Sequence, residues 1–77
     1  MSARRVVFRV HTIQRMARRH VSISDVRQVL ENGERIDEYP DDKPFPSALV
    51  LGWCDSRPLH VVVADNFDDN EAIVVTV

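Results

Sequence analysis

The spacing of apolar residues changes character near the middle of the chain. In residues 12–19 and 23–32, apolar side chains recur every three or four positions, which is the period of an amphipathic helix. From residue 34 onward they alternate or run together in short stretches bounded by Pro, Asp and Asn, which is typical of strands. The predicted strands are residues 34–39, 47–54, 58–64 and 72–77. Residues 6–10, which are mostly β-branched, are expected to form a short extended lead-in to the first helix.

Local signals set the boundaries of the two predicted helices. His20 is expected to end the first helix in a left-handed conformation, in which histidine is enriched. Ser22 then caps the second helix with Asp25 as its capping-box partner, and Gly33 follows its last turn. Helices first and strands afterwards, joined by short turns, predict a single α+β domain over residues 1–77. Two N-terminal helices would pack on one face of an antiparallel meander of about four strands.

Size and composition narrow the class of protein. A chain of 77 residues is long enough for one domain only, and its single cysteine, Cys54, excludes an internal disulfide. No apolar run approaches the ~20 residues that a membrane span needs, and residues 1–9 lack the apolar stretch of a signal peptide. We therefore expect a cytoplasmic protein without membrane contact, which would gain stability by forming a homodimer or a complex with a partner.

Charge is distributed unevenly, although the net charge is only −2. Residues 1–20 contain six arginines and no acid, whereas all 12 acidic residues come later. In the first predicted helix, Ile13, Met16 and Ala17 fall on one side, and a basic stripe falls on the other. The stripe consists of His11, Arg15, Arg18 and Arg19. It either binds the phosphates of a nucleic acid or is a solvated face that pairs with acids of residues 34–42.

His60 stands inside a predicted strand that is otherwise apolar. It is either a hydrogen-bonded histidine of the core or a site residue at the sheet surface. Two histidines and one arginine suffice for metal-free RNA cleavage. One imidazole removes the 2′-hydroxyl proton, the other protonates the leaving 5′-oxygen, and the guanidinium stabilises the added negative charge. His11, His60 and Arg15 are therefore the catalytic candidates.

Other polar residues are assigned structural roles. No His, Cys and acid spacing matches a metal site, so no metal and no cofactor are predicted. Asp65, Asp68 and Asp69 are expected to form turns, and Cys54 is expected to pack in the core.

The order of these residues resembles a bacterial family, the one catalogued as domain of unknown function 4258. The similarity covers about residues 8–77 and rests on many short matches. The matching positions are His11, Arg15-Met16, Arg19, Val21-Ser22, Asp25-Val26, residues 39–46, Leu51-Gly52, and residues 58–62 and 75–77. The family is similar to the RelE-like ribonuclease toxin fold group, and its genes often lie beside a small antitoxin. The resemblance implies a toxin–antitoxin component with a site formed by His11, Arg15, Arg19, His60 and Thr76.

The chain departs from the family pattern in two places. His20 stands where the family typically has glycine. The pattern also usually continues past position 77 with an aromatic residue and a proline; if the natural chain ends at Val77, a base-stacking group is missing.

The leading hypothesis is a metal-independent endoribonuclease toxin that acts on RNA, alone or on the ribosome, and is bound by a small antitoxin. Arg18, Arg19 and Thr76 would contact the RNA. A rival hypothesis is a non-catalytic module that binds RNA or an acidic protein. A third has the arginines paired within a homodimer.

Overall fold

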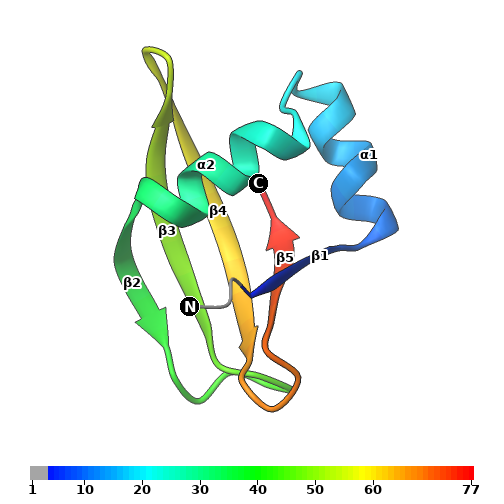
Figure 1. Ribbon diagram of the computed structural model, residues 1–77, viewed down its shortest axis with the longest axis vertical. Helices are drawn as coiled ribbons and strands as arrows, with labels where there is room; N and C mark the ends of the chain where they lie inside the picture. The colour runs from blue at the N-terminus through cyan, green and yellow to red at the C-terminus, as the bar shows by residue number, and fades with distance from the viewer. Residues whose placement is uncertain (1–3) are drawn as a thin grey trace.

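The computed structural model describes residues 4–77, which form two helices and a five-stranded mixed sheet (Figure 1). In chain order the elements are β1 (Arg5–Phe8), α1 (Val10–Arg18), α2 (Ile23–Asn32), β2 (Glu34–Tyr39), β3 (Ser47–Cys54), β4 (Arg57–Asn66) and β5 (Glu71–Thr76). The strands lie side by side in the order β1-β5-β4-β3-β2. The α+β class, both helices and all four predicted strands are confirmed.

The prediction of a purely antiparallel meander of about four strands is wrong at one edge. Part of the expected lead-in is a fifth strand, β1, which pairs in parallel with β5 so that Val6 lies opposite Ala72 and Phe8 opposite Val74. The other pairs, β2 with β3, β3 with β4 and β4 with β5, are antiparallel. The β-branched residues indicated the extended conformation, but the pairing could not be predicted because the partner strand lies at the other end of the chain.

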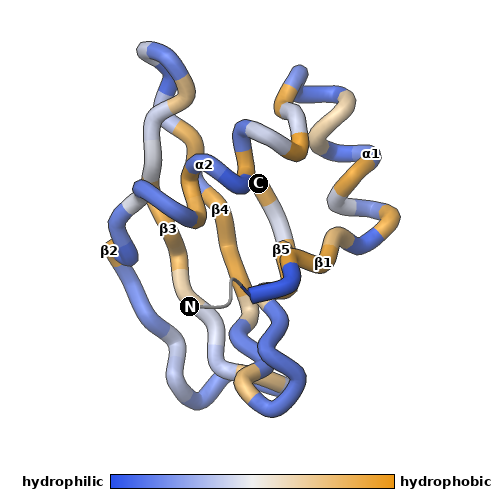
Figure 2. The backbone as a smooth tube through the Cα atoms, viewed as in Figure 1, coloured by the Kyte–Doolittle hydropathy of each residue, from blue (hydrophilic) through white to orange (hydrophobic). Residues whose placement is uncertain are grey.

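The core lies between α2 and one face of the sheet. α2 packs across β3 and β4, and its Val26 and Val29 are fully buried. The strand residues of this core are Ala48, Val50, Cys54, Leu59, Val61, Val63, Ala72 and Val74. Figure 2 shows the same division, with hydrophobic residues concentrated in the central strands and hydrophilic residues along β2 and the turns. Because each fully buried valine contributes roughly 1.5–3 kcal/mol, this layer supplies most of the stability.

The predicted signals at the helix boundaries are confirmed. His20 follows α1 with a φ of 57°, and Ser22 and Asp25 make both hydrogen bonds of the capping box at 3.0 Å. The backbone N–H of Ser22 donates to the carboxylate of Asp25, and this hydrogen bond is the main cause that lowers the pKa of Asp25. Gly33 follows Asn32, the last residue of α2, as predicted, and is extended, with a φ of −77°. No helix within residues 4–77 is long and apolar enough to cross a bilayer.

α2 comes very close to the sheet at Gly52. A Cβ atom there would lie 2.9 Å from Val29 Cγ2 and 3.1 Å from Val29 Cα, so a side chain would push the helix away from the strand. We expect Gly52→Ala to lower the free energy of unfolding by about 1–3 kcal/mol, because overpacking outweighs the entropy that alanine removes from the unfolded chain. Thermal unfolding against Ser56→Ala, in the exposed β3–β4 turn, measures the effect. An equal melting temperature for both variants would contradict this packing.

α1 lies beside the end of β5, beyond the residues of β5 that pair with β1 (Figure 1). A β-bulge leaves Val75 without a partner in β4, between the pairs Val63–Val74 and Val62–Thr76. Thr12, fully buried on α1, places its Oγ1 3.2 Å from Val74 O and 3.0 Å from Val75 O, so its hydroxyl proton is shared between them. A side chain of α1 therefore hydrogen-bonds to two carbonyls of β5 and attaches the helix to the strand.

The prediction of which side of α1 is buried is wrong. Thr12 and Met16 are buried, whereas Ile13 is 46% exposed and Ala17 is exposed. A threonine occupies the inward position because its hydroxyl bonds to the strand, a contact that a hydrophobicity pattern cannot indicate. Arg15 consequently lies beside the sheet and not opposite the buried side of the helix.

Candidate functional site

One face of the sheet points away from α2. Side chains alternate along a strand, so the residues between the core positions of β3 and β4 point to this second face. Leu51 lies directly opposite His60 there, and Trp53 lies opposite Pro58. On β5, Thr76 lies opposite Val62. The surface formed by Leu49, Leu51, Trp53, His60, Val62 and Thr76 is called the open face below.

His60 is exposed on the open face. Its neighbours Leu59 and Val61 are 7% and 0% exposed because they point into the core, and the alternation turns the imidazole outward. The interpretation of His60 as a buried core histidine is therefore excluded.

Thr76 and Arg15 both lie near the end of β5. Thr76 is paired with Val62, which stands two positions from His60 on the same face, and such diagonal neighbours are about 7–8 Å apart. Arg15 approaches from α1, where its Nε donates to the carbonyl of Val77, the residue after Thr76, at 3.2 Å. The fold thus gathers three of the predicted site residues around the end of β5.

The other predicted residues lie on α1 and are exposed. His11 is one turn before Arg15 and shares its side of the helix, and Arg18 and Arg19 end the helix. Among residues 4–77, no hydrogen bond or ion pair joins His11 to His60. The pairing of these two histidines as acid and base stays a prediction.

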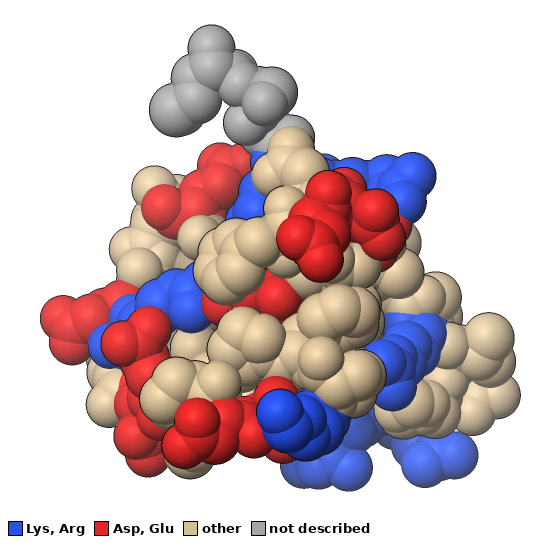
Figure 3. All heavy atoms as spheres, turned by 90° about the horizontal axis from the view of Figure 1, so that it is seen from below, with Lys and Arg blue, Asp and Glu red and all other residues tan. Residues whose placement is uncertain are grey.

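The arginines of α1 carry uncompensated charge. Within the described part of the chain, the ion pairs are made by Arg4, Arg5 and Arg35, and none is made by Arg15, Arg18 or Arg19. The acids of residues 34–42 therefore do not neutralise the basic stripe. Figure 3 shows the separation from below, with acidic side chains mainly on the side of β2 and basic ones mainly on the side of α1.

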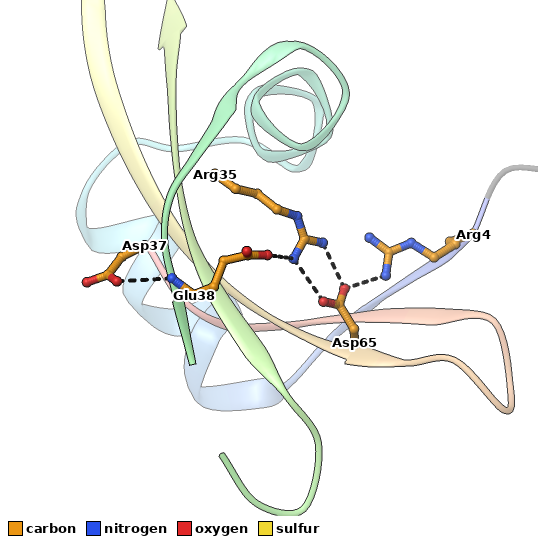
Figure 4. Close-up of polar contacts among 5 residues, drawn as sticks. All are labelled: Arg4, Arg35, Asp37, Glu38 and Asp65. Atoms are coloured by element: carbon orange, nitrogen blue, oxygen red, sulfur yellow. Dashed lines mark hydrogen bonds and ion pairs between the residues drawn. The ribbon is translucent and has the colours of Figure 1, made fainter. Parts of the chain in front are cut away.

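A second polar cluster was missed by the sequence analysis. Asp65, expected in a turn, lies in β4 and is 3% exposed. Arg35 of β2 binds both of its carboxylate oxygens at 3.0 Å, and Arg4 donates to Oδ1 at 2.5 Å (Figure 4). Burial alone would raise the pKa of Asp65, but the hydrogen bonds from Arg35 and Arg4 outweigh burial and hold that pKa below its usual value.

This cluster holds the fold together and offers little to a substrate. Both oxygens of Asp65 are occupied; Arg35 lies in β2 at one edge of the sheet, and Arg4 directly precedes β1 at the other edge. The three residues are separated by 61 and 30 positions in sequence, so no motif could indicate them. The one available signal was an acid directly following the apolar run of residues 61–64.

Two further features concern metal and thiol chemistry. Within residues 4–77, no group of three or more His, Cys, Asp and Glu lies close enough to hold a metal ion. Cys54 packs in the core as predicted, and burial raises the pKa of its thiol.

Comparison with known proteins yields a family. A family model described as Domain of unknown function (DUF4258) matches residues 8–77, a range that includes every candidate site residue. No curated protein and no solved structure matches the chain.

Proposed function

Because the chain belongs to the DUF4258 family, whose description leaves the activity open, we propose a function from the site itself: a metal-independent endoribonuclease of toxin type. The observation that supports the proposal is the exposed imidazole of His60, which lies diagonally across β4 and β5 from Thr76, next to Val77, the residue that Arg15 contacts. A RelE-like relationship of the fold, two helices on a sheet, is part of the same proposal.

The proposed chemistry needs only imidazole and guanidinium groups. The 2′-oxygen of RNA attacks the adjacent phosphorus while its proton passes to one histidine. The bond from phosphorus to the 5′-oxygen breaks as the other histidine donates a proton to it. The products are a 2′,3′-cyclic phosphate and a 5′-hydroxyl. His60 and His11 would exchange these protons, and Arg15 would stabilise the negative charge on the phosphoryl oxygens.

The substrate class follows from the surface around this site. Arg18 and Arg19 carry charge that no carboxylate of residues 4–77 neutralises, and phosphates bind such groups with a strong dependence on salt. The open face offers apolar side chains and the hydroxyl of Thr76, which suit unstacked bases and sugar–phosphate contacts. We therefore propose single-stranded RNA as substrate, free or on the ribosome, and a small antitoxin as the partner.

A non-catalytic binding function is the alternative, and one observation favours it. Val10 is 73% and Ile13 46% exposed on the same helix that carries the arginines. An apolar stripe beside unneutralised positive charge suits an acidic amphipathic segment of another protein. In that case α1 would be a docking surface, and His60 would have no chemical role.

Cleavage of RNA in the presence of a chelator tests the proposal. We expect the purified protein to cut a labelled single-stranded RNA, or RNA on ribosomes, in EDTA and to leave 2′,3′-cyclic phosphate ends. A matched RNA with 2′-deoxyribose at the mapped cleavage position should stay intact, because the attacking hydroxyl is absent. If neither free nor ribosome-bound RNA is cut and induced expression does not slow growth, the enzyme proposal fails and the binding alternative stands.

A further inference from the structure

A hollow of about 330 Å³ lies next to Trp53, where the sheet has an uncovered edge. β2 pairs with β3 only as far as the pair Glu34–Leu51, so residues 52–54 of β3 have no neighbouring strand on that side. α2 passes beside this edge, and its Gln28 and Asn32 also line the hollow. The volume is at the lower end of the roughly 300–1,000 Å³ typical of small-molecule sites, which suits a single ring system.

Trp53 presents its ring to solvent and stands next to the candidate site. It is 59% exposed, although tryptophan is the side chain with the most apolar area to bury. Trp53 is paired with Pro58 on the open face, and His60 stands two positions further along the same strand. This diagonal arrangement places the Cα atoms of Trp53 and His60 about 7–8 Å apart, a separation that one nucleotide can span.

Polar groups around the hollow match the edge of a nucleobase. Gln28 donates from Nε2 to Trp53 O at 3.3 Å, which fixes its amide against the strand and leaves its oxygen free to accept. The amide of Asn32 and the carboxylate of Glu34 add further donors and acceptors to the lining. Asn, Gln and Glu are the side chains that pair with the hydrogen-bonding edges of bases.

We propose that Trp53 and this hollow bind one base of single-stranded RNA, stacked on the indole, beside the phosphodiester at His60. The proposal rests on the proposed function and names its substrate contact. A single exposed ring flanked by amides and a carboxylate suits a flat, polar-edged base better than it suits a protein surface, which needs a wider apolar area. Aromatic rings stack on every kind of base, so this contact gives affinity first and base preference second.

Fluorescence provides a direct test because Trp53 is the only tryptophan in the chain. The probes are 2′-O-methyl octanucleotides of A, C, G and U, which lack the attacking hydroxyl and stay uncut. We expect saturable quenching of the indole emission, with the purine octamers binding more tightly than the pyrimidine octamers. Fluorescence anisotropy of an end-labelled octamer should show binding about 5- to 150-fold weaker for Trp53→Ala, and near-normal binding for Trp53→Phe. Phe67→Ala, in an aromatic residue 70% exposed in the β4–β5 turn, is the matched control and should bind like the parent protein.

The outcomes separate this site from the proposed activity. Saturable quenching without any RNA cleavage would support the base site and reject the nuclease. Cleavage and octamer affinity that are both unchanged in Trp53→Ala would overturn the base site and leave the nuclease standing. The base site is also overturned if no octamer quenches the indole, or if Trp53→Ala only abolishes self-association measured by light scattering, since the ring would then contact a second copy.

Discussion

Replacing His60 by alanine is expected to slow RNA cleavage about 10²–10⁴-fold, the usual contribution of a general acid or base. The loss should appear in the rate at saturating RNA, because the imidazole transfers protons in the transition state and contributes little to RNA binding. His60 is exposed, so the free energy of unfolding should change by less than about 0.5 kcal/mol. Initial rates on a fluorogenic RNA, together with the melting temperature of each variant, measure both quantities.

The matched control is His20→Asn. His20 is also an exposed histidine, but it follows α1 with a φ of 57°, which asparagine adopts with little strain, and it is not part of the open face. This variant should cleave RNA at the parent rate. A His60→Ala protein that retains full activity would move the acid–base role elsewhere, and equal losses in both variants would point to an indirect effect of either substitution.

The fold was predictable where local chemistry decides it. The capping box of Ser22 and Asp25, the left-handed His20 and the strand Ser47–Cys54 each depend on neighbouring residues, and all three are confirmed. The pairing of β1 was missed because it depends on β5. A segment of four residues carries no pattern that indicates a partner so far along the chain. The inward turn of Thr12 was missed for a related reason, since its hydroxyl is stabilised by carbonyls more than 60 positions away.

The candidate site could be predicted in its residue types but not in its geometry. From sequence alone, a histidine in an apolar strand is compatible with either face of a sheet, and only the position of α2 decides that His60 faces away from the core. Arg15 was identified as cationic, yet its bond to Val77 O, which brings it to the sheet, depends on how α1 is rotated. Trp53 was not predicted as a site residue because a tryptophan in a strand is expected to be largely buried.

Asp65→Asn is expected to be the most destabilising polar substitution in the described chain. The change removes the charge that receives three hydrogen bonds from Arg4 and Arg35, while it preserves the volume of the side chain. Loss of a buried, doubly paired carboxylate costs about 3–5 kcal/mol when its partners stay buried. Here the side chains of Arg4 and Arg35 are 31% and 36% exposed and can reach water. We therefore expect the free energy of unfolding to fall by about 2–3 kcal/mol.

That loss is large for a domain of this size. A chain of 77 residues has a free energy of unfolding of about 4–12 kcal/mol, and the expected fall in melting temperature is roughly 10–20 °C. Asp68→Asn, an exposed acid in the following turn, makes the same chemical change without a buried partner and should shift stability by less than about 0.5 kcal/mol. Similar melting temperatures for the two variants would show that the arginine pairs contribute nothing net.

The pH dependence gives a second, independent measure of the same cluster. The pKa of Asp65 is lowered in the folded protein, so the unfolded state takes up its proton first as the pH falls. Its stabilising contribution is therefore complete well above the unfolded value of about 4 and is lost as the pH falls below that value toward the folded pKa. The gap in unfolding free energy between the parent protein and Asp65→Asn should be widest near neutral pH and should shrink below about pH 4. Urea unfolding at pH 7 and at about pH 3 measures that gap; an equal gap at both would mean that packing, and not charge, accounts for the destabilisation.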